Sequence, residues 1–279
     1  METEPDRVPG KVKTKMKKLM IVASAALCAA VGFGDITSQN VVGYATDTLA
    51  QNKFIIKAIQ FEDIASGAVD ANKVLSGFTG VDYDDASAFM LTAPQILVQA
   101  AGAGYNTYYY LNDAYVEETD STKPGWADLN GNYVDLALTP GTAVWMKVPG
   151  GDAEATMAGN VSDATEVPVE IPAGKFTLVG NGYPASVTLN GKQMTSDDIK
   201  GADYDEASAF MLTAPQILVQ AAGAGYTTYY YLNDAYVEET DNTKPGWADL
   251  NGNYVEPKIA VGAGFWVKSS DKMNITFNP

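Results

Sequence analysis

The apolar and polar positions along the chain form a series of short extended runs separated by turn residues. In the first half, runs rich in β-branched and aromatic residues cover 54–59, 95–99, 105–111, 114–118, 142–148 and 153–157. Two further segments, 72–78 and 192–199, fit one or two helical turns. Short strands that recur every 8–12 residues or so between turn signals are typical of an all-β sandwich or barrel. We therefore expect an all-β protein.

One stretch of the chain occurs twice. Residues 86–134 return as residues 207–255, 121 positions later, and only two positions differ, Asn106 opposite Thr227 and Ser121 opposite Asn242. The flanking runs recur as 176–179, 263–269 and 274–277. A long internal repeat predicts repeated structural units. We therefore predict two tandem, near-identical β-sandwich or barrel-like domains, at residues 35–160 and 161–279.

Residues 1–34 have the order of a secretory signal peptide. Met16-Lys17-Lys18 is positive, Leu19 to Val31 is apolar, and Gly32-Phe33-Gly34 supplies small residues for cleavage. The apolar run is too short, with the wrong flanks, for a stable membrane span. A buried N-terminal helix is the alternative, and translation starts at Met1 or Met16. We expect a secreted protein, extracellular, on the cell surface or in the periplasm, without membrane insertion in the mature form.

The chain is strongly acidic. Its formal net charge is −16, and removal of residues 1–34 changes it to −19. A surface of this charge repels phosphate backbones, so we expect no nucleic-acid partner.

The residue types limit the chemistry. The chain has no histidine, and its single cysteine, Cys28, lies in the leader. Ser-His-Asp and Cys-His catalysis, thiol redox chemistry and His or Cys metal sites are therefore excluded for the mature chain. Carboxylate chemistry, oxygen-ligated Ca²⁺ and ligand binding remain.

Asn130-Gly131, between two short extended runs, predicts a two-residue hairpin turn. This turn would pair Asp128 with Tyr133 and Trp126 with Asp135, and would place all four side chains on one face of the hairpin. The second copy repeats the arrangement. The candidate ligand-binding residues are Trp126, Asp128, Tyr133, Asp135, Trp247, Asp249, Tyr254 and Glu256.

Two aromatic rings beside two carboxylates suit a sugar, because rings stack on pyranose faces and carboxylates accept hydrogen bonds from hydroxyls. Tyrosine and tryptophan also provide a large contact area at a low cost in conformational entropy. Ordinary aromatic packing with solvated acids at the rim is the alternative interpretation.

Trp145 and Trp266 are secondary candidates. Alternation along each strand puts Trp145 on the face of Lys147, and Trp266 on the face of Lys268. A lysine usually marks the wetter face of a strand. A ligand platform, a seam between the two copies or a covering loop would each explain the pattern.

No cofactor is expected, with Ca²⁺ as the one candidate. Asp128 to Asn132 resembles a calcium loop, but the EF-hand pattern needs glycine at the sixth position, where Tyr133 stands. The acidic runs Glu117-Glu118-Thr119-Asp120 and Tyr83-Asp84-Asp85 are alternatives. Paired carboxylates also permit glycoside hydrolysis, but two nearly identical active sites in one small chain would be unusual.

Three features together resemble a set of uncharacterised, β-rich, secreted bacterial proteins that occur as many paralogues. They are Asn40-Val41-Val42-Gly43-Tyr44, the Tyr108-Tyr109-Tyr110 strand followed by Gly125-Trp126, and Pro140-Gly141 leading to Trp145. The second copy departs from the pattern, with Val261 in place of the proline. The resemblance implies the class and the compartment, and no activity or site.

Two functions from different classes follow. The first is a secreted or cell-surface, non-enzymatic structural or adhesive protein that assembles with other copies of itself. The second is a carbohydrate-binding module with one aromatic and carboxylate site in each repeat and an extracellular glycan as its partner.

Overall fold

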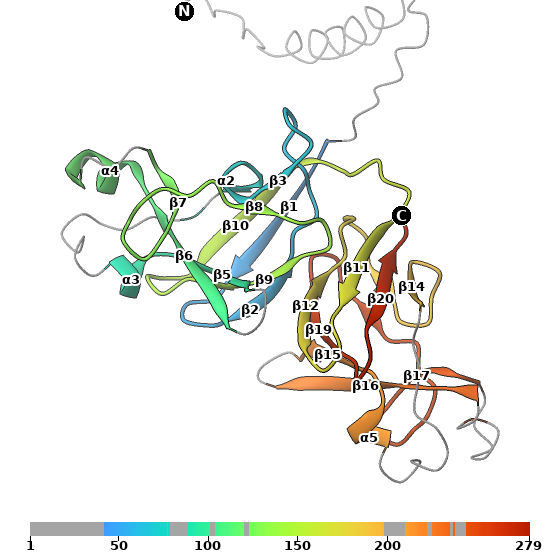
Figure 1. Cartoon of the computed structure of the whole chain (residues 1–279). Coiled ribbons are helices and arrows are strands. Elements are labelled where there is room, and N and C mark those ends of the chain that lie inside the picture. The colour runs from blue at the N-terminus through green and yellow to red at the C-terminus, as the bar shows by residue number, and fades with distance from the viewer. Residues whose placement is uncertain are drawn as a thin grey trace, which may run out of the picture. The chain divides into compact units, whose positions relative to one another are not determined.

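A computed structural model describes residues 42–76, 78, 89–100, 104–119, 123–197, 210–221, 225–234, 237 and 244–279 (Figure 1). The predicted signal peptide and the Tyr83-Asp84-Asp85 run lie outside these residues. Asn40–Pro279 form one unit.

The first half of this unit, up to Asn160, contains two larger sheets and one strand pair (Figure 1). A five-stranded sheet has the order β2-β9-β5-β6-β7, a three-stranded sheet has the order β1-β10-β4, and β3 pairs with β8. The strands are β1 (Val42–Leu49), β2 (Ile55–Ala58), β3 (Val69–Asp70), β4 (Leu75–Ser76), β5 (Gln95–Gln99), β6 (Tyr105–Leu111), β7 (Gly125–Ala127), β8 (Ala137–Leu138), β9 (Ala143–Lys147) and β10 (Ala153–Asn160). The helices are α2 (Ala71–Val74), α3 (Phe89–Thr92) and α4 (Asp113–Thr119).

The second half, from Val167, has sheets of the same strand order. They are β12-β19-β15-β16-β17, β11-β20-β14 and the pair β13-β18. The strands are β11 (Val167–Ile171), β12 (Phe176–Gly180), β13 (Val187–Thr188), β14 (Met194–Asp197), β15 (Gln216–Gln220), β16 (Tyr226–Leu232), β17 (Gly246–Ala248), β18 (Lys258–Ile259), β19 (Gly264–Lys268) and β20 (Met273–Phe277). The short helix α5 spans Phe210–Thr213.

The prediction of an all-β chain is confirmed, because strands predominate and the described helices are short. The predicted runs 95–99 and 105–111 coincide with β5 and β6. The predicted boundary at residue 160 falls at the end of β10, and the independence of the two domains stays a prediction.

Two local predictions are wrong. Residues 114–118 belong to helix α4 rather than to a strand, because Asn112 precedes them as a helix cap. Its side-chain oxygen accepts a hydrogen bond from the N–H of Tyr115 at 3.0 Å, and its carbonyl accepts one from Val116. Residues 194–197 form strand β14 rather than helical turns, since they pair with β20.

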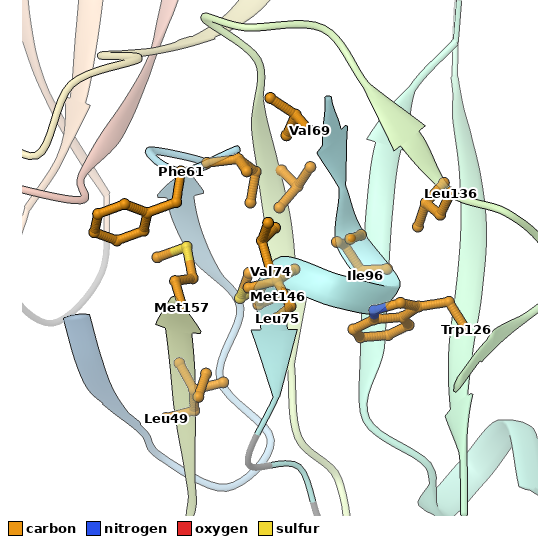
Figure 2. Close-up of a cluster of buried hydrophobic side chains, with 14 of the residues drawn as sticks. Leu49, Phe61, Val69, Val74, Leu75, Ile96, Trp126, Leu136, Met146 and Met157 are labelled. Carbon is orange, nitrogen blue, oxygen red and sulfur yellow. The ribbon is translucent and has the colours of Figure 1, made fainter. Parts of the chain in front are cut away.

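The side chains of both sheets in the first half share one apolar cluster. Leu49 and Met157 come from β1 and β10, whereas Ile96, Met146 and Trp126 come from the five-stranded sheet, and all are at least 99% buried. Figure 2 shows these side chains gathered between the strands. The second half has a cluster of the same kind, which includes Trp247, Phe265 and Phe277.

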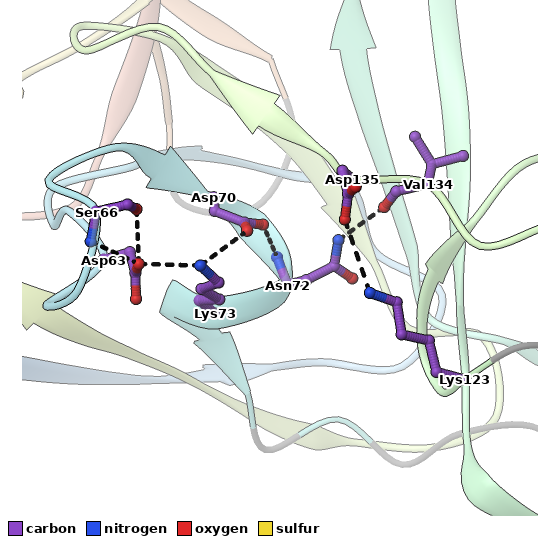
Figure 3. A network of polar contacts seen from close by, with 8 residues as sticks. All are labelled: Asp63, Ser66, Asp70, Asn72, Lys73, Lys123, Val134 and Asp135. Carbon is purple, nitrogen blue, oxygen red and sulfur yellow. Dashed lines mark hydrogen bonds and ion pairs between the residues drawn. The ribbon is translucent and has the colours of Figure 1, made fainter.

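Asn72 ties α2 to the strand that carries Trp126. Figure 3 shows its contact with Val134 on the other side of the predicted hairpin. The side-chain N–H of Asn72 donates to the Val134 carbonyl at 2.7 Å, and its side-chain oxygen accepts from the backbone N–H of Trp126 at 2.7 Å. Asn190 makes the corresponding bonds with Val255 and Trp247 in the second half. A side-chain amide thus holds the entry to each predicted hairpin.

Candidate functional site

The hairpin at Asn130-Gly131 has a three-residue loop, and its predicted register is wrong by one position. Ala127 forms the bridge with Tyr133, and the Asp128 N–H donates to the Asn132 carbonyl at 2.9 Å. Gly131 has φ +80°, the left-handed conformation expected at the last position of such a loop. The slip puts Tyr133 opposite Ala127, so Trp126, Asp128, Tyr133 and Asp135 do not share the predicted face.

The Asp128 side chain sets this loop. One carboxylate oxygen accepts hydrogen bonds from the N–H groups of Asn130 and Asn132 at 2.8 and 2.9 Å, and the other accepts from the Asn132 amide. Burial raises the pKa of Asp128, but the bonds from Asn132 and Asn130 outweigh it and lower the pKa overall. Asp249 has the same bonds with Asn251 and Asn253. These carboxylates support turns rather than facing a shared ligand site.

Trp126 and Trp247 lie in the hydrophobic core. Their side chains are 0% and 1% exposed, and each ring packs edge-on against a core tyrosine, Tyr110 at 5.5 Å or Tyr231 at 5.4 Å between centroids. A ring without an exposed face offers no surface for stacking on a sugar. The alternative of ordinary aromatic packing therefore holds for these two tryptophans.

The remaining hairpin candidates form a surface cluster with a lysine. The Lys123 ammonium lies 3.8 Å from the Tyr133 ring centroid and 3.9 Å from an Asp135 carboxylate oxygen. In the second half, Lys244 lies 3.9 Å from the Tyr254 centroid, and Glu256 accepts a hydrogen bond from the Tyr254 hydroxyl at 3.0 Å. In each cluster the lysine and the carboxylate balance each other's charge, and the lysine covers one face of the tyrosine ring.

The secondary candidates Trp145 and Trp266 meet where the two halves contact each other. We call this contact the seam. The Ala58 N–H donates to the Gly262 carbonyl at 3.0 Å, and the Gly180 N–H donates to the Gly141 carbonyl at 2.9 Å. These pairs are repeat equivalents of each other, so the halves use the same face reciprocally, as subunits of a symmetric dimer do. The interpretation of the Trp-Lys pattern as a seam between copies agrees with this placement.

The backbones approach closely at the seam. A Cβ atom on Gly180 would lie 2.5 Å from the Ala58 Cβ, well inside the van der Waals distance. Ile56, Ala143 and Leu178 fill the rest of the seam as a small apolar cluster, against which Trp145 and Trp266 pack.

Four rings form a chain of contacts across the seam, which we call the aromatic row. Its members, in order, are Phe54, Trp145, Trp266 and Phe176, and the distances between successive centroids are 6.1, 6.4 and 6.1 Å. The row has the same residue types when followed from either end. The phenylalanines are 42% and 40% exposed, so the ends of the row are open to solvent.

A lysine stands at each end of the aromatic row. The Lys147 ammonium lies 5.2 Å from the Phe54 centroid, and the Lys268 ammonium lies 5.1 Å from the Phe176 centroid. Both distances are within the range of a cation–π contact. The two cations give the row a local positive charge in an otherwise acidic chain.

Two tyrosines flank the middle of the row. The Tyr105 hydroxyl accepts a hydrogen bond from the Trp145 indole N–H at 3.3 Å, and its ring packs edge-on against Trp266 at 6.4 Å. Burial raises the pKa of Tyr105, the Trp145 bond opposes this, and neighbouring Tyr226 adds to the rise. Tyr105 and Tyr226 are 39% and 42% exposed, so both phenol groups are accessible to solvent.

Two glutamines bind the halves together beside the row. The Gln99 side-chain oxygen accepts from the Leu178 N–H at 2.8 Å, and its amide donates to the Phe176 carbonyl. The Gln220 oxygen accepts from the Ile56 N–H at 3.1 Å, and its amide donates to the Phe54 carbonyl at 2.9 Å. Each amide thus replaces a peptide group at the edge of the opposite sheet.

A groove of about 340 Å³ opens at this place. Its walls include Gln99, Tyr105, Phe176, Leu218, Tyr226 and Trp266. The volume lies at the lower end of the range for small-ligand sites, roughly 300–1,000 Å³.

Sequence reasoning found Trp145 and Trp266 but missed Phe54, Phe176, Tyr105, Tyr226 and the two glutamines. The available signal was the repeated position of glutamine at the last residue of β5 and β15. A polar residue that ends a strand in both copies gives no hint of its partner, because the partner lies more than 70 residues away.

Within the described residues, no group of three or more acidic side chains is placed to hold a metal ion. Asp120 of the acidic run after Tyr115 is outside the described residues, so calcium binding stays an untested prediction. None of the helices described is long and apolar enough to cross a membrane.

Comparisons with protein-family models, with curated protein sequences and with solved structures gave no match.

Proposed function

We propose that the chain is a secreted, non-enzymatic binding protein, built as a tandem of two β-sandwich repeats, whose ligand is an extracellular glycan. The observation that carries the proposal is the aromatic row with its flanking tyrosines and groove at the seam. The site lies between the repeats, rather than once in each repeat as the hairpin candidates required.

The chemistry of the groove supports a carbohydrate. Rings with open faces contact the C–H surfaces of sugar rings, while phenol and amide groups exchange hydrogen bonds with hydroxyls. Tyr105 and Tyr226 supply exposed phenols beside Trp266, which is half-buried. Ring contacts that succeed one another at about 6 Å across the seam suit a chain of several sugar units better than a single sugar.

The test is binding of soluble polysaccharides in affinity electrophoresis, followed by calorimetry on those that retard the protein. Tyr226→Ala removes an exposed groove wall, and we expect it to weaken binding about tenfold or more, as truncation of a central aromatic contact commonly does. Tyr254→Ala is the matched control, since Tyr254 lies in the lysine cluster of the same half.

Unchanged affinity of Tyr226→Ala would contradict the proposal, as would the failure of every polysaccharide to bind. If Tyr254→Ala and Tyr133→Ala abolished binding while Tyr226→Ala did not, the ligand would lie on the surface clusters instead.

Secretion is tested separately. Expression with the native leader in a host with a secretory pathway should yield a mature chain whose N-terminal sequence begins near Asp35. A chain that retains residues 1–34 would contradict the signal-peptide prediction.

A structural or adhesive protein that assembles with its own copies is the second candidate. The repeat-to-repeat face cannot serve for this assembly while it is paired within the chain at the seam. One other feature, the outer edge of β1, favours self-association.

A further inference from the structure

The outer edge of strand β1 differs from the equivalent edge in the second half. β1 pairs with β10 along all eight of its residues, and within the described residues no strand pairs with its other side. β11 holds the same position beside β20. An unpaired edge presents backbone N–H and C=O groups that can add a strand from another chain.

Pro168 shows which backbone groups point outward. Proline has no N–H, so in an antiparallel ladder it fits only where that group would point away from the partner strand. Pro168 stands opposite Thr276, and the matching position in the first half is Thr46, opposite Thr156. The hydroxyl oxygens of Thr46 and Thr156 lie 3.4 Å apart, as in a close pair that is not hydrogen-bonded through the backbone.

The N–H and C=O groups of Thr46 therefore point away from β10. Because the pattern repeats every second residue, those of Tyr44 and Thr48 point the same way. Their side chains are also exposed, Tyr44 by 79%.

The edge of β1 lacks the protection that β11 has. Natural sheets block exposed edges with proline or with charged side chains. β11 carries Pro168 and Glu170, whereas the alternating exposed positions of β1 are Val42, Tyr44, Thr46 and Thr48. The acid between them, Asp47, is paired with Lys57. The exposed side chains of β1 therefore carry no charge, although the chain has a net charge of −16.

We propose that the outer edge of β1 binds the same edge of a second copy of this chain. Antiparallel pairing of the strand with itself, centred on Thr46, aligns the outward backbone groups of the two copies and brings no like charges together. Such a contact is two-fold and closes after two chains. Pro168 blocks the corresponding edge of the second half, so assembly ends at a dimer rather than a filament.

The test is sedimentation velocity of the full chain, expressed with its own leader, over a range of protein concentrations. The unaltered chain should show a monomer–dimer equilibrium. Thr46→Pro should remove the dimer and leave the melting curve nearly unchanged, because the second half already accommodates proline at this ladder position. Thr46→Val, which keeps the N–H, should dimerise like the unaltered chain. A chain that is monomeric at every concentration, or an undiminished dimer of Thr46→Pro, would overturn the proposal.

Thr46→Lys covers the case in which Thr46→Pro fails to fold. It places two like charges opposite each other at the centre of the contact while leaving the exposed surface of the monomer otherwise intact. Its dimer should be lost at low salt and should partly return at high salt. A dimer that forms equally well at low salt would refute the β1 contact.

Discussion

The side chain of Gln99 binds the backbone of β12, and the side chain of Gln220, its counterpart 121 residues later, binds the backbone of β2. Each side-chain amide accepts from the N–H of one residue in the other half and donates to the carbonyl of the residue two positions before it. The carbonyls belong to Phe54 and Phe176, which are the two ends of the aromatic row. The same contacts that join the halves therefore also position the row.

Replacing both glutamines by alanine should weaken the seam. The amides of Ile56 and Leu178 lose their acceptors, and each lost hydrogen bond should cost about 1 kcal/mol. Hydrogen exchange should accelerate at these two amides. Gln95→Ala is the control, because the Gln95 side chain donates to the Met90 carbonyl within its own half. Equal protection in the double variant and the control would show that the glutamines do not hold the seam.

Asn72→Ala should destabilise the first half by about 1–3 kcal/mol, because the backbone N–H of the buried residue Trp126 is left without its side-chain acceptor. Urea denaturation followed by tryptophan fluorescence would measure the change. Asn130→Ala serves for comparison, since Asn130 is exposed and uses its backbone N–H in the loop. Similar midpoints for the two variants would disprove the role of Asn72.

Gly131→Val should cost about 1–3 kcal/mol through backbone strain. The residue has φ +80°, and an added Cβ would lie 2.5 Å from the Tyr115 hydroxyl oxygen. Thermal melting would detect the loss. At Gly151 an added Cβ meets no atom within 4 Å, so Gly151→Val should melt nearly as the unaltered chain does. A melt of Gly131→Val that matches this control would defeat the turn assignment.

Asp63 should remain ionised to unusually low pH. The Ser66 hydroxyl at 2.6 Å and the Lys73 ammonium at 3.0 Å lower the pKa of Asp63 to about 2, against an ordinary value of about 3.9 (Figure 3). Because the folded pKa is the lower one, the stabilisation is complete above about pH 4 and is lost as pH falls through about 2.

Ser66→Ala should raise the pKa of Asp63 toward its ordinary value, and an NMR titration of the carboxyl carbon would measure it. A titration midpoint near 4 in the unaltered chain would contradict the contacts around this carboxylate.

The local sequence predicted the strands well where the residue types favoured a strand over any other secondary structure. The Tyr-Thr run of β6 and the apolar run of β5 coincide with their predicted bounds, because β-branched and aromatic residues favour a half-buried pleated surface. Helix α4 was not predicted, because the helix cap supplied by Asn112 outweighs the strand preference of Tyr115 and Val116.

The predicted hairpin site was less predictable, because the strand register of the hairpin depended on one side chain. Asp128 accepts two backbone N–H groups and so enlarges the loop by one residue, which transfers Tyr133 to the other face of the hairpin. The aromatic row joins residues from both halves, and no local pattern encodes a contact between Trp145 and Trp266. Only the shared face of tryptophan and lysine indicated that these strands had a second role.

The reciprocity of the seam has a consequence for any polymer that the groove holds. A polysaccharide has distinct reducing and non-reducing ends, but the row begins and ends with the same lysine and phenylalanine pair. A strand that left the groove wall of Phe176 and Trp266 and followed the whole row to Phe54 would therefore meet equivalent ring and lysine contacts in both directions. A protein of this kind would cover a polysaccharide without regard to the orientation of its chains.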